Sequence, residues 1–460
     1  MKKIYLILFA LLGLHLLLLF NLQFTAWPEI LSYAYLKNSG FSLYGGMVHP
    51  YPPLLTLTLS YLYKIFGYGI PVERAFYYLM LLINDVSVFL IAKKITGNKL
   101  AALASVSVYI LTQPFLEGNM LWFDNAIVTP VLLATLFLTR YLDKEKISDL
   151  FISSLFFTAA VLIKQTAAIF PAITFLFLLF TGKNKPRAFS FLLLPVLLGG
   201  TFLTYLYLKQ ELIWFFNWSL IYPSRYWTAY PTYVQLGLSK KDIAVWIVLV
   251  FPVLILFFQK SREFIKNKAL LLLGVLTAGA LLAIYPRFSF YHAQTAIAFM
   301  SVFTGIWLSL NSKKPHHLSL FILLAYFIVV KPVWVRDWGK DVRFYSGEDR
   351  KLTQAIKESG VKGSVYMMNI NSAQYIYTNT RPPIPWVDNF GWYFEIPGFQ
   401  DEVLAGWMNN PPEYVVWKDP IPGEWFYIGT YQPAKITDWI RKNYIMTKEL
   451  EDGVRLWKKK

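Results

Sequence analysis

The chain has 460 residues, of which 56% are hydrophobic and only 15% charged, against about 25% charged in soluble domains, so lipid is the expected surrounding for most of it. The absence of cysteine excludes disulfide scaffolds, thiol nucleophiles, iron–sulfur clusters and cysteine-type zinc sites. The formal net charge of +17 would suit nucleic acid, but the basic residues follow the connections between apolar segments, so nucleic acid is not an expected partner.

Long apolar segments recur along the first three quarters of the chain. A membrane-spanning helix needs about 20 mostly apolar residues, and about eleven segments approach that length. The first segment is longer than the apolar core of a signal peptide and has no small-residue cleavage site, so we expect an uncleaved anchor helix. The expected spans are 4–22, 73–92, 100–116, 125–141, 148–163, 166–181, 188–208, 243–259, 269–285, 290–310 and 317–333.

Lysine and arginine are concentrated in alternate connections between these segments. The connections 23–72, 117–124, 209–242 and 286–289 are aromatic and less basic for their length than the others. Because short basic loops mark the cytoplasmic side, the N-terminus is predicted to be cytoplasmic and the C-terminus extracytoplasmic. An extracytoplasmic domain without cysteine favours the cell membrane of a prokaryote over a disulfide-rich secretory lumen.

From about residue 340 the composition changes, and helix-like and strand-like segments alternate. The segments "DRKLTQAIKESG", "QDEVLAGWMNN" and "AKITDWIRKNY" are predicted helices, and "SVYMMN", "EYVVW" and "GVRLWKKK" are predicted strands. The expected fold is therefore a polytopic α-helical membrane domain over 1–338 and a small extracytoplasmic α/β domain over 339–460.

The connection 23–72 is the first outer loop, and it is too long to be a simple link. Its sequence is too apolar for disorder, and it contains two segments with helical spacing. The first, "PEILSYAYLKNSG", runs from Pro28 to a stop at Gly40, and the second, "YPPLLTLTLSYLYKIFG", ends at Gly67. We expect two helices that lie in the membrane interface.

Ionisable side chains gather at the predicted outer ends of the spans, which by default suggests a functional site. The two acids Glu29 and Asp124 are the catalytic candidates. Glu29 could instead be a solvated acid at a helix N-terminus, and Asp124 a helix N-cap. The candidate partners for a phosphate or a donor are Lys164, Arg225, Arg287, His49 and His292.

These cations also have structural interpretations. Lys164 could extend to the interface as a snorkelling lysine, and His49 could satisfy a loop backbone. Arg225 and Arg287 could serve packing as well as anion binding. Within the second span, Asn84 and Asp85 are expected to make structural polar contacts, and His15 is expected to form an interior hydrogen bond.

The order of these features resembles the GT-C superfamily of polyprenyl-phosphate-sugar glycosyltransferases, in the branch that resembles protein mannosyltransferases and aminoarabinose transferases. The motifs are "WPEILSYAYLKNSG", "LYGGMVHPYPPLL", "YKIFG", "WFDNAIVTPVLLATLFLTRYL" and "FTAAVLIKQTAAIFPA". The resemblance implies a GT-C-like fold and a donor with its isoprenoid tail in lipid. One departure is that the family's Asp-Glu pair is Pro28-Glu29 here, so its first acid is missing.

The resemblance implies transfer of a sugar, mannose by family, to an acceptor hydroxyl on the outer face by a single inverting displacement. Glu29 is the first choice for the base, with Asp124 supporting it, and the cations meet the leaving phosphate. The candidate contacts to the acceptor or sugar are Tyr51, Trp122, Gln165 and Tyr226. The expected acceptors are a glycolipid, a lipid-linked oligosaccharide or a protein.

A divalent metal, Mg or Mn, is a further candidate ligand, because Glu29, Asp124 and His49 are suitable donors, although no spacing signature supports it. The alternative function is a multi-span transporter or flippase of a lipid-linked sugar. Such a protein should show inverted repeats with helices broken in matching halves, and none is evident in the sequence.

Overall fold

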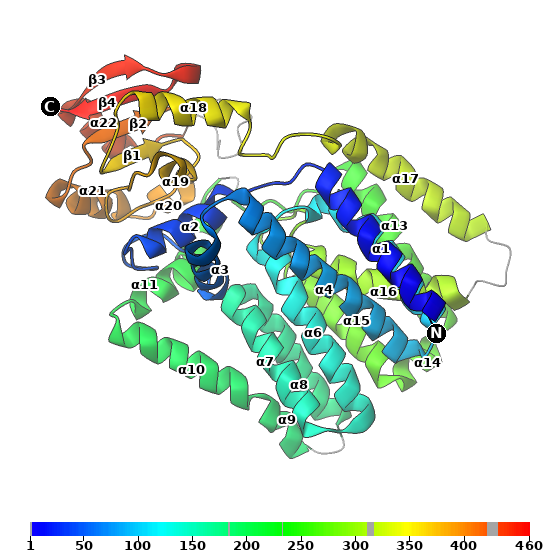
Figure 1. Cartoon of the computed structure of the whole chain (residues 1–460). Coiled ribbons are helices and arrows are strands. Elements are labelled where there is room, and N and C mark those ends of the chain that lie inside the picture. Colours follow the sequence, from blue (N-terminus) through cyan, green and yellow to red (C-terminus); the bar gives the residue numbers. More distant parts are fainter. Residues whose placement is uncertain (1, 183–184, 232, 311–316, 421–430) are drawn as a thin grey trace. The chain divides into compact units, whose positions relative to one another are not determined.

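The computed structural model describes residues 2–182, 185–231, 233–310, 317–420 and 431–460. The chain forms two compact units, and each joins segments that are distant in the sequence (Figure 1). The first comprises 1–25, 73–204 and 236–341, and the second comprises 26–72, 205–235 and 342–460. The predicted division, into a membrane domain over 1–338 and an extracytoplasmic domain over 339–460, concerns location relative to the membrane and stays a prediction.

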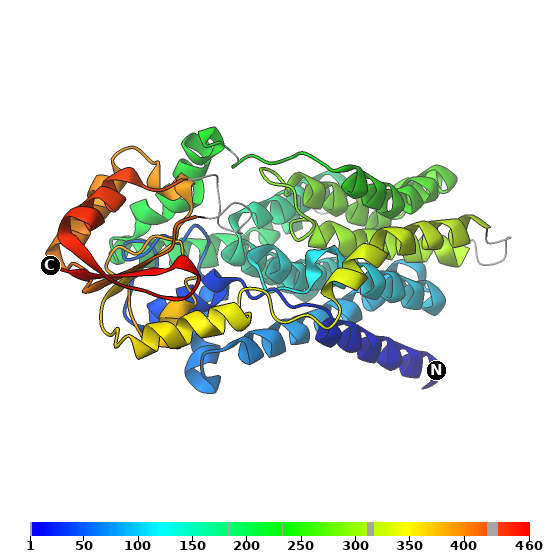
Figure 2. The same ribbon diagram turned by 90° about the horizontal axis from the view of Figure 1, so that it is seen from above.

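The first unit is a bundle of helices. In Figures 1 and 2 its long helices run side by side, and α6 packs against α7, α5 against α16, and α8 against α15. The helices are α1 (Lys2–Asn21), α4 (Ile70–Thr96), α5 (Lys99–Thr112), α6 (Phe123–Lys144), α7 (Ile147–Ile163), α8 (Ile169–Thr181), α9 (Lys185–Phe191), α10 (Leu193–Leu208), α13 (Lys240–Gln259), α14 (Ser261–Lys266), α15 (Lys268–Leu282), α16 (Gln294–Leu310) and α17 (His317–Asp337).

Each predicted span coincides with helix in this bundle, although boundaries differ by several residues. Among the described residues, five helices are long and apolar enough to cross a membrane: Lys3–Asn21, Ile70–Thr96, Phe123–Lys144, Lys185–Leu208 and Lys240–Gln259. Shorter apolar helices of 10–17 residues account for most of the other predicted spans. A mostly helical membrane protein is thus supported, and the number of about eleven spans stays a prediction.

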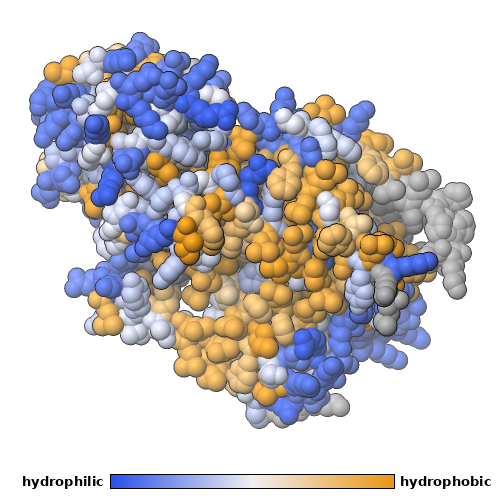
Figure 3. Space-filling model, viewed as in Figure 1, coloured by the Kyte–Doolittle hydropathy of each residue, from blue (hydrophilic) through white to orange (hydrophobic). Residues whose placement is uncertain are grey.

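The surface of the bundle is apolar where a lipid-facing surface is expected. Figure 3 shows apolar residues over the helices of this unit. Leu6, Phe9 and Phe20 of α1, and Val196 and Leu197 of α10, are among the exposed side chains. Apolar side chains at this density would be unfavourable in water, so their exposure agrees with lipid as the solvent.

Two helices of the second unit come from the predicted first outer loop. They are α2 (Pro28–Asn38), with Pro28 in its first turn, and α3 (Leu54–Phe66), which ends at Gly67 with a positive φ of 85°. In α3 one face is buried, while Tyr61 and Ile65 are exposed, which fits an interfacial helix. In α2, however, every residue from Pro28 to Leu36 is buried, so α2 is an enclosed helix.

The rest of the second unit contains a four-stranded sheet in the order β1-β2-β4-β3. Strands β1 (Val365–Met368) and β2 (Tyr414–Trp417) are parallel, whereas β4 (Arg455–Lys459) is antiparallel to both β2 and β3 (Tyr444–Glu449). The accompanying helices are α11 (Leu212–Phe216), α12 (Tyr222–Arg225), α18 (Gly347–Glu358), α19 (Gln374–Thr378), α20 (Gly391–Phe394), α21 (Phe399–Asn409) and α22 (Ala434–Asn443).

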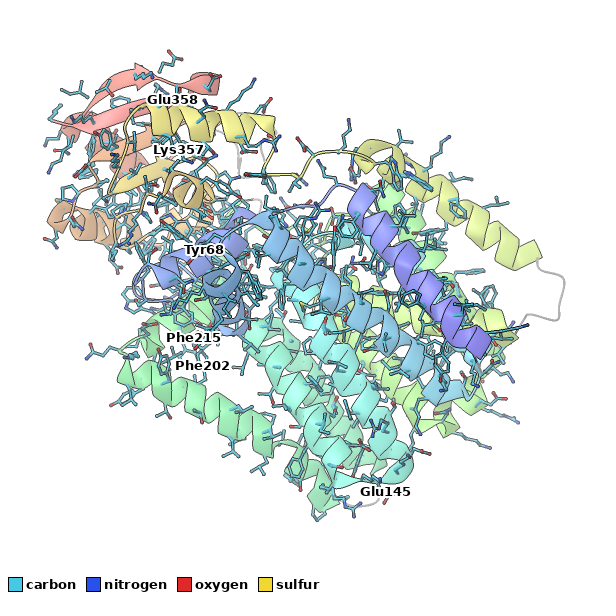
Figure 4. All side chains as sticks on the ribbon, viewed as in Figure 1. Tyr68, Glu145, Phe202, Phe215, Lys357 and Glu358 are labelled. Carbon is cyan, nitrogen blue, oxygen red and sulfur yellow. The ribbon has the colours of Figure 1, made fainter. Side chains whose placement is uncertain are left out.

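The elements of this α/β part follow from local signals. Ser346 and Asp349 form a capping box that begins α18. At the other end of this helix, Lys357 and Glu358 are exposed and labelled in Figure 4, whereas Ile356 is buried. The structure therefore confirms the predicted helices and strands of this part, and it contains one further strand, β3, that the sequence did not predict. The extracytoplasmic position of the α/β part stays a prediction.

Candidate functional site

Three of the predicted site residues meet in the first unit and form what we call the Asp124 cluster: Asp124, Lys164 and His292. The Lys164 Nζ donates to Asp124 Oδ1 at 2.5 Å, and His292 Nδ1 lies 3.0 Å from Asp124 Oδ2. The side chains are only 4%, 10% and 13% exposed, respectively. A carboxylate flanked by an ammonium and an imidazole at these distances is held in its charged form by an ion pair that water screens poorly.

Local backbone geometry places the first two members of the cluster. Asp124 lies in the first turn of α6, where the helix N-terminus favours negative charge. The interpretation of Asp124 as the N-cap is wrong, because Trp122 occupies that position. Lys164 follows α7 in an extended conformation, and a 3-10 turn over Gln165–Ala168 comes next. Lys164 is buried against Asp124, so its interpretation as a snorkelling lysine is also wrong.

His292 is the third member and lies in the segment before α16. Burial lowers the pKa of His292, and the positive charges of Lys164 and Arg287 lower it further, against the opposing effect of the Asp124 carboxylate. A neutral His292 whose Nδ1 carries the proton toward Asp124 presents a lone pair on Nε2. Among the described residues Nε2 has no hydrogen-bond partner. The imidazole can therefore accept a proton or, once protonated, donate to an anion.

The second unit contains a different arrangement, in which Glu29 faces another acid, Asp388. Both side chains are buried, at 1% and 3% exposure. Neither carboxylate oxygen of Glu29 has a hydrogen-bond donor among the described residues, and Asp388 accepts only at Oδ1, from the Asn389 N–H. The interpretation of Glu29 as a solvated acid is therefore wrong.

Electrostatics indicates that this acid pair shares a proton. Burial raises the pKa of Glu29 well above its ordinary value, and the charge of Asp388 raises it further. Burial also raises the pKa of Asp388, to about 6, although the hydrogen bond from the Asn389 N–H and the neighbouring Glu29 carboxyl counteract this rise. Two buried carboxyls this close are not expected to ionise together, so near neutral pH the pair holds one proton between its two members.

Sequence reasoning missed Asp388, although a signal was present. It is the sole charged residue between Arg381 and Glu395, in the aromatic run "PPIPWVDNFGWYF". Sparse charge in an apolar surrounding is the feature that singled out Glu29. Sequence reasoning also passed over Glu73, which lies in the first turn of α4, is fully buried and has no hydrogen-bond partner among the described residues.

The remaining predicted residues divide between the two units. In the second unit, His49 donates or accepts at Nε2 with the Thr56 hydroxyl at 2.8 Å, and burial lowers the pKa of His49 to about 3. Arg225 is exposed, with its guanidinium 5.5 Å from the centre of the Tyr226 ring, and Tyr51 is half-buried. The half-buried Trp122 and Gln165 belong to the first unit, together with Arg287.

The predicted metal donors are distributed over the two units: Glu29 and His49 belong to the second, and Asp124 belongs to the first. Within the described ranges no group of three or more histidine, aspartate or glutamate side chains is arranged to hold a metal ion. No reaction step is derived through a metal, and the metal candidates stay a prediction.

Comparisons with known proteins give a family match over part of the chain and a shared fold. Residues 49–208 match the family model of dolichyl-phosphate-mannose-protein mannosyltransferase. The chain is similar in fold to ArnT from Cupriavidus metallidurans bound to undecaprenyl phosphate, with a TM-score of 0.62 and 11% identity over 99% of this chain and 98% of that one. No curated protein matches the chain in sequence.

Two archaeal structures share the fold. The Archaeoglobus fulgidus oligosaccharyltransferase in complex with Zn and sulfate gives a TM-score of 0.58 with 12% identity, covering 89% of this chain and 67% of that one. Its AglB in complex with an inhibitory peptide and a dolichol-phosphate gives 0.52 with 11% identity, covering 90% and 69%. The resemblance to GT-C glycosyltransferases is thus confirmed at the level of fold.

Proposed function

We propose that this protein is an integral-membrane glycosyltransferase that moves a sugar from a polyprenyl-phosphate donor to an acceptor hydroxyl. The family match over 49–208 and the fold shared with ArnT bound to undecaprenyl phosphate support this proposal. The observation that carries it is the Asp124 cluster, because it places a lysine and a histidine around a fixed carboxylate in an apolar bundle. A lipid phosphate needs such cations at membrane depth.

In this proposal the Asp124 cluster acts on the leaving phosphate. Asp124 is already paired on both oxygens, which makes it a poor base and a good orienting group. Lys164 would offset the charge that grows on the phosphate oxygen as its bond to the anomeric carbon breaks. The negative charge of a bound phosphate would favour the protonated form of His292, whose Nε2 could then donate to it. Arg287 belongs to the same role, because its charge already acts on His292. Arg225, which is exposed over Tyr226, is the weaker candidate.

The acid pair of Glu29 and Asp388 supplies the base. With one proton already bound, it can accept a second from the acceptor hydroxyl, and the pKa of about 6 at Asp388 is close to neutral pH, as an effective base requires. The new bond joins the acceptor oxygen to the anomeric carbon, the bond to the phosphate oxygen breaks, and the polyprenyl phosphate leaves with the bonding electrons. A single displacement of this kind inverts the anomeric centre.

The donor sugar is proposed to be mannose, and the acceptor a glycolipid, a lipid-linked oligosaccharide or a protein hydroxyl on the extracytoplasmic face. The test is to incubate the purified protein in lipid nanodiscs with a panel of polyprenyl-phosphate sugars and candidate acceptors, and to measure released polyprenyl phosphate and glycosylated product by mass spectrometry. Release and product together, both absent with Lys164→Ala, support the proposal. A donor that crosses the bilayer uncleaved would contradict it and favour a flippase.

A further inference from the structure

The turn between α5 and α6 has an unusual backbone. Residues Pro114–Gly118 form one widened helical turn in which Leu116 and Glu117 leave helical geometry, and Glu117 has a positive φ of 54°. A non-glycine residue rarely adopts this conformation, so the surrounding structure must hold it in place. Neighbouring side chains do so from two directions.

On one side, the turn is tied to the segment that carries His292. The Glu117 carboxylate accepts hydrogen bonds from the Ser289 hydroxyl and, at 3.3 Å, from the Tyr291 N–H. The Gln294 side-chain amide donates to the Leu116 carbonyl at 2.5 Å. His292 is thus flanked in sequence by residues that the turn holds.

On the other side, the turn is tied to the interior of the bundle. The Gln113 Nε2 donates to the Gly118 carbonyl at 2.7 Å, and the Tyr77 hydroxyl donates to the same oxygen at 2.6 Å. The Asn125 amide donates to the Tyr77 hydroxyl at 3.2 Å, next to Asp124 in α6. A Cβ added at Gly118 would lie 2.0 Å from the Gln113 carbonyl oxygen, so only glycine fits there.

Gln113 is in turn oriented by His15 and Asp85, all three of them buried. His15 Nδ1 lies 2.8 Å from Asp85 Oδ2, and His15 Nε2 lies 3.1 Å from Gln113 Oε1. Because Gln113 Nε2 is committed to a carbonyl, its Oε1 must accept, so His15 must carry a proton on Nε2. A second proton lies between Nδ1 and Asp85. Loss of either proton would turn one of these contacts into a repulsion between lone pairs.

We propose that His15, Gln113 and Glu117 are positioning residues that hold His292 against Asp124 through the turn Pro114–Gly118. His15 and Asp85 fix the Gln113 amide, and Gln113 fixes Gly118. Glu117 holds the segment before His292, and the Leu116 carbonyl holds Gln294 after it. The expected effect on catalysis rests on the proposed function, whereas the expected effect on local opening of the turn does not. The pair of His15 and Asp85 therefore has a role beyond packing α1 against α4.

The test uses the absence of native cysteine. Met120 follows the turn and is buried, so Met120→Cys introduces a single thiol that should react slowly with a soluble maleimide in nanodiscs. Gln113→Ala and His15→Ala should each accelerate labelling about tenfold or more through local opening. The double substitution should add little, because residues in one network are not additive. Ser105→Ala is the matched control, because it removes a buried hydrogen bond to the Val302 carbonyl outside this network.

Activity provides the second measurement. If the Asp124 cluster is catalytic, Gln113→Ala should lower kcat about 10- to 100-fold through misplacement of His292, with donor KM little changed. If Gln113→Ala fails to fold, Gln113→Glu replaces it in the test. This variant keeps the size and the acceptor oxygen but loses the amide donor, so it should show the same fall in kcat. Labelling that stays at the background rate in these variants, or that Ser105→Ala accelerates equally, would overturn the inference. Accelerated labelling in a protein that transfers no sugar would refute only the proposed function.

Discussion

Two buried acids of the molecule, Asp124 and Glu29, have neighbours of opposite kinds. Asp124 lies between Lys164 and His292, so its negative charge is balanced by neighbouring groups. Glu29 lies against Asp388, a second acid, with no cation in an ion pair to either among the described residues. Both acids are almost fully buried, yet Asp124 stays ionised, whereas Glu29 belongs to a carboxyl pair that shares a proton.

This contrast shows that burial alone does not assign a catalytic role. A buried carboxylate with cationic neighbours is a poor proton acceptor, because accepting a proton would break its ion pairs. A buried carboxyl pair that already shares one proton gains little by staying charged and can take up another. The sequence-based proposal that Glu29 is the base and Asp124 a supporting residue therefore keeps its two roles, with Asp388 added beside Glu29.

The contrast is tested most severely by removing the cation from the Asp124 cluster. Lys164→Ala should lower the transfer rate about 1000-fold, because an electrostatic partner of the leaving phosphate is lost. It should also destabilise the protein by about 3–5 kcal/mol, since Asp124 would remain buried with one partner fewer. Steady-state transfer assays and thermal unfolding in detergent measure the two effects. Full activity in a folded Lys164→Ala protein would remove the cluster from the mechanism.

The acid pair is tested by Glu29→Gln. The amide of glutamine can donate to Asp388, so the protein should fold and keep its thermal stability, whereas the rate should fall by about 100-fold or more, because the pair loses one of its two carboxyls and the remaining one becomes a weaker base. Glu29→Asp is the matched control, because it retains a carboxyl and should retain part of the activity. A Glu29→Gln protein that is as active as the unsubstituted one would leave the pair a purely structural feature.

The pH dependence of the rate distinguishes the two regions without substitution. Because the pair must accept a proton, activity should be full above the pKa of Asp388 of about 6 and should fall as the pH drops through that value. Below it, the pair carries two protons, and the rate should fall about tenfold per pH unit. Rates measured in buffers of matched ionic strength report this limb. A rate that stays flat well below pH 6 would contradict the assignment of the base.

The helical framework of both units followed from sequence to a large extent. Apolar runs predicted the helices of the bundle because lipid requires long apolar segments with satisfied backbones. From the sequence, Asp124, Lys164 and His292 were expected only to lie on the same, outer side of the membrane, without being assigned to one another as partners. Contacts between residues so distant in sequence depend on helix packing, which periodicity does not encode.

The acid pair could not be derived in the same way. Glu29 was singled out by its isolation, but its partner Asp388 lies 359 positions away (positions 29 and 388), in a connecting segment without a strong motif. Similarly, Asp85 was expected to make a structural polar contact and His15 an interior hydrogen bond, without a partner being identified for either. Their connection through Gln113 to a strained turn depends on one backbone conformation at Glu117, which no sequence pattern specifies.

A milder change separates stability from activity within the acid pair. Asp388→Asn replaces a buried charge with an amide that can donate to Glu29, so it should stabilise the protein at neutral pH by about 1–2 kcal/mol. The same change should lower the transfer rate about tenfold, because the acid whose pKa lies near neutral pH is lost and Glu29 must act as the base alone. Thermal unfolding at pH 7 and initial rates measure the two effects. Destabilisation together with unchanged activity would show that the two acids do not oppose each other.

The smallest effect is expected from the two arginines that sequence alone could not tell apart. Arg225 is exposed, and its contact with the Tyr226 ring is of a kind that contributes about 0.5–1 kcal/mol, so Arg225→Ala should change the rate by no more than about twofold. Arg287 acts electrostatically on His292, so Arg287→Ala should lower the rate about tenfold and weaken donor binding. Because both substitutions remove the same group, a comparison of donor KM between them isolates the effect of position. A larger loss with Arg225→Ala than with Arg287→Ala would mean that the leaving phosphate is met by the second unit, and it would reverse the roles assigned to the two regions.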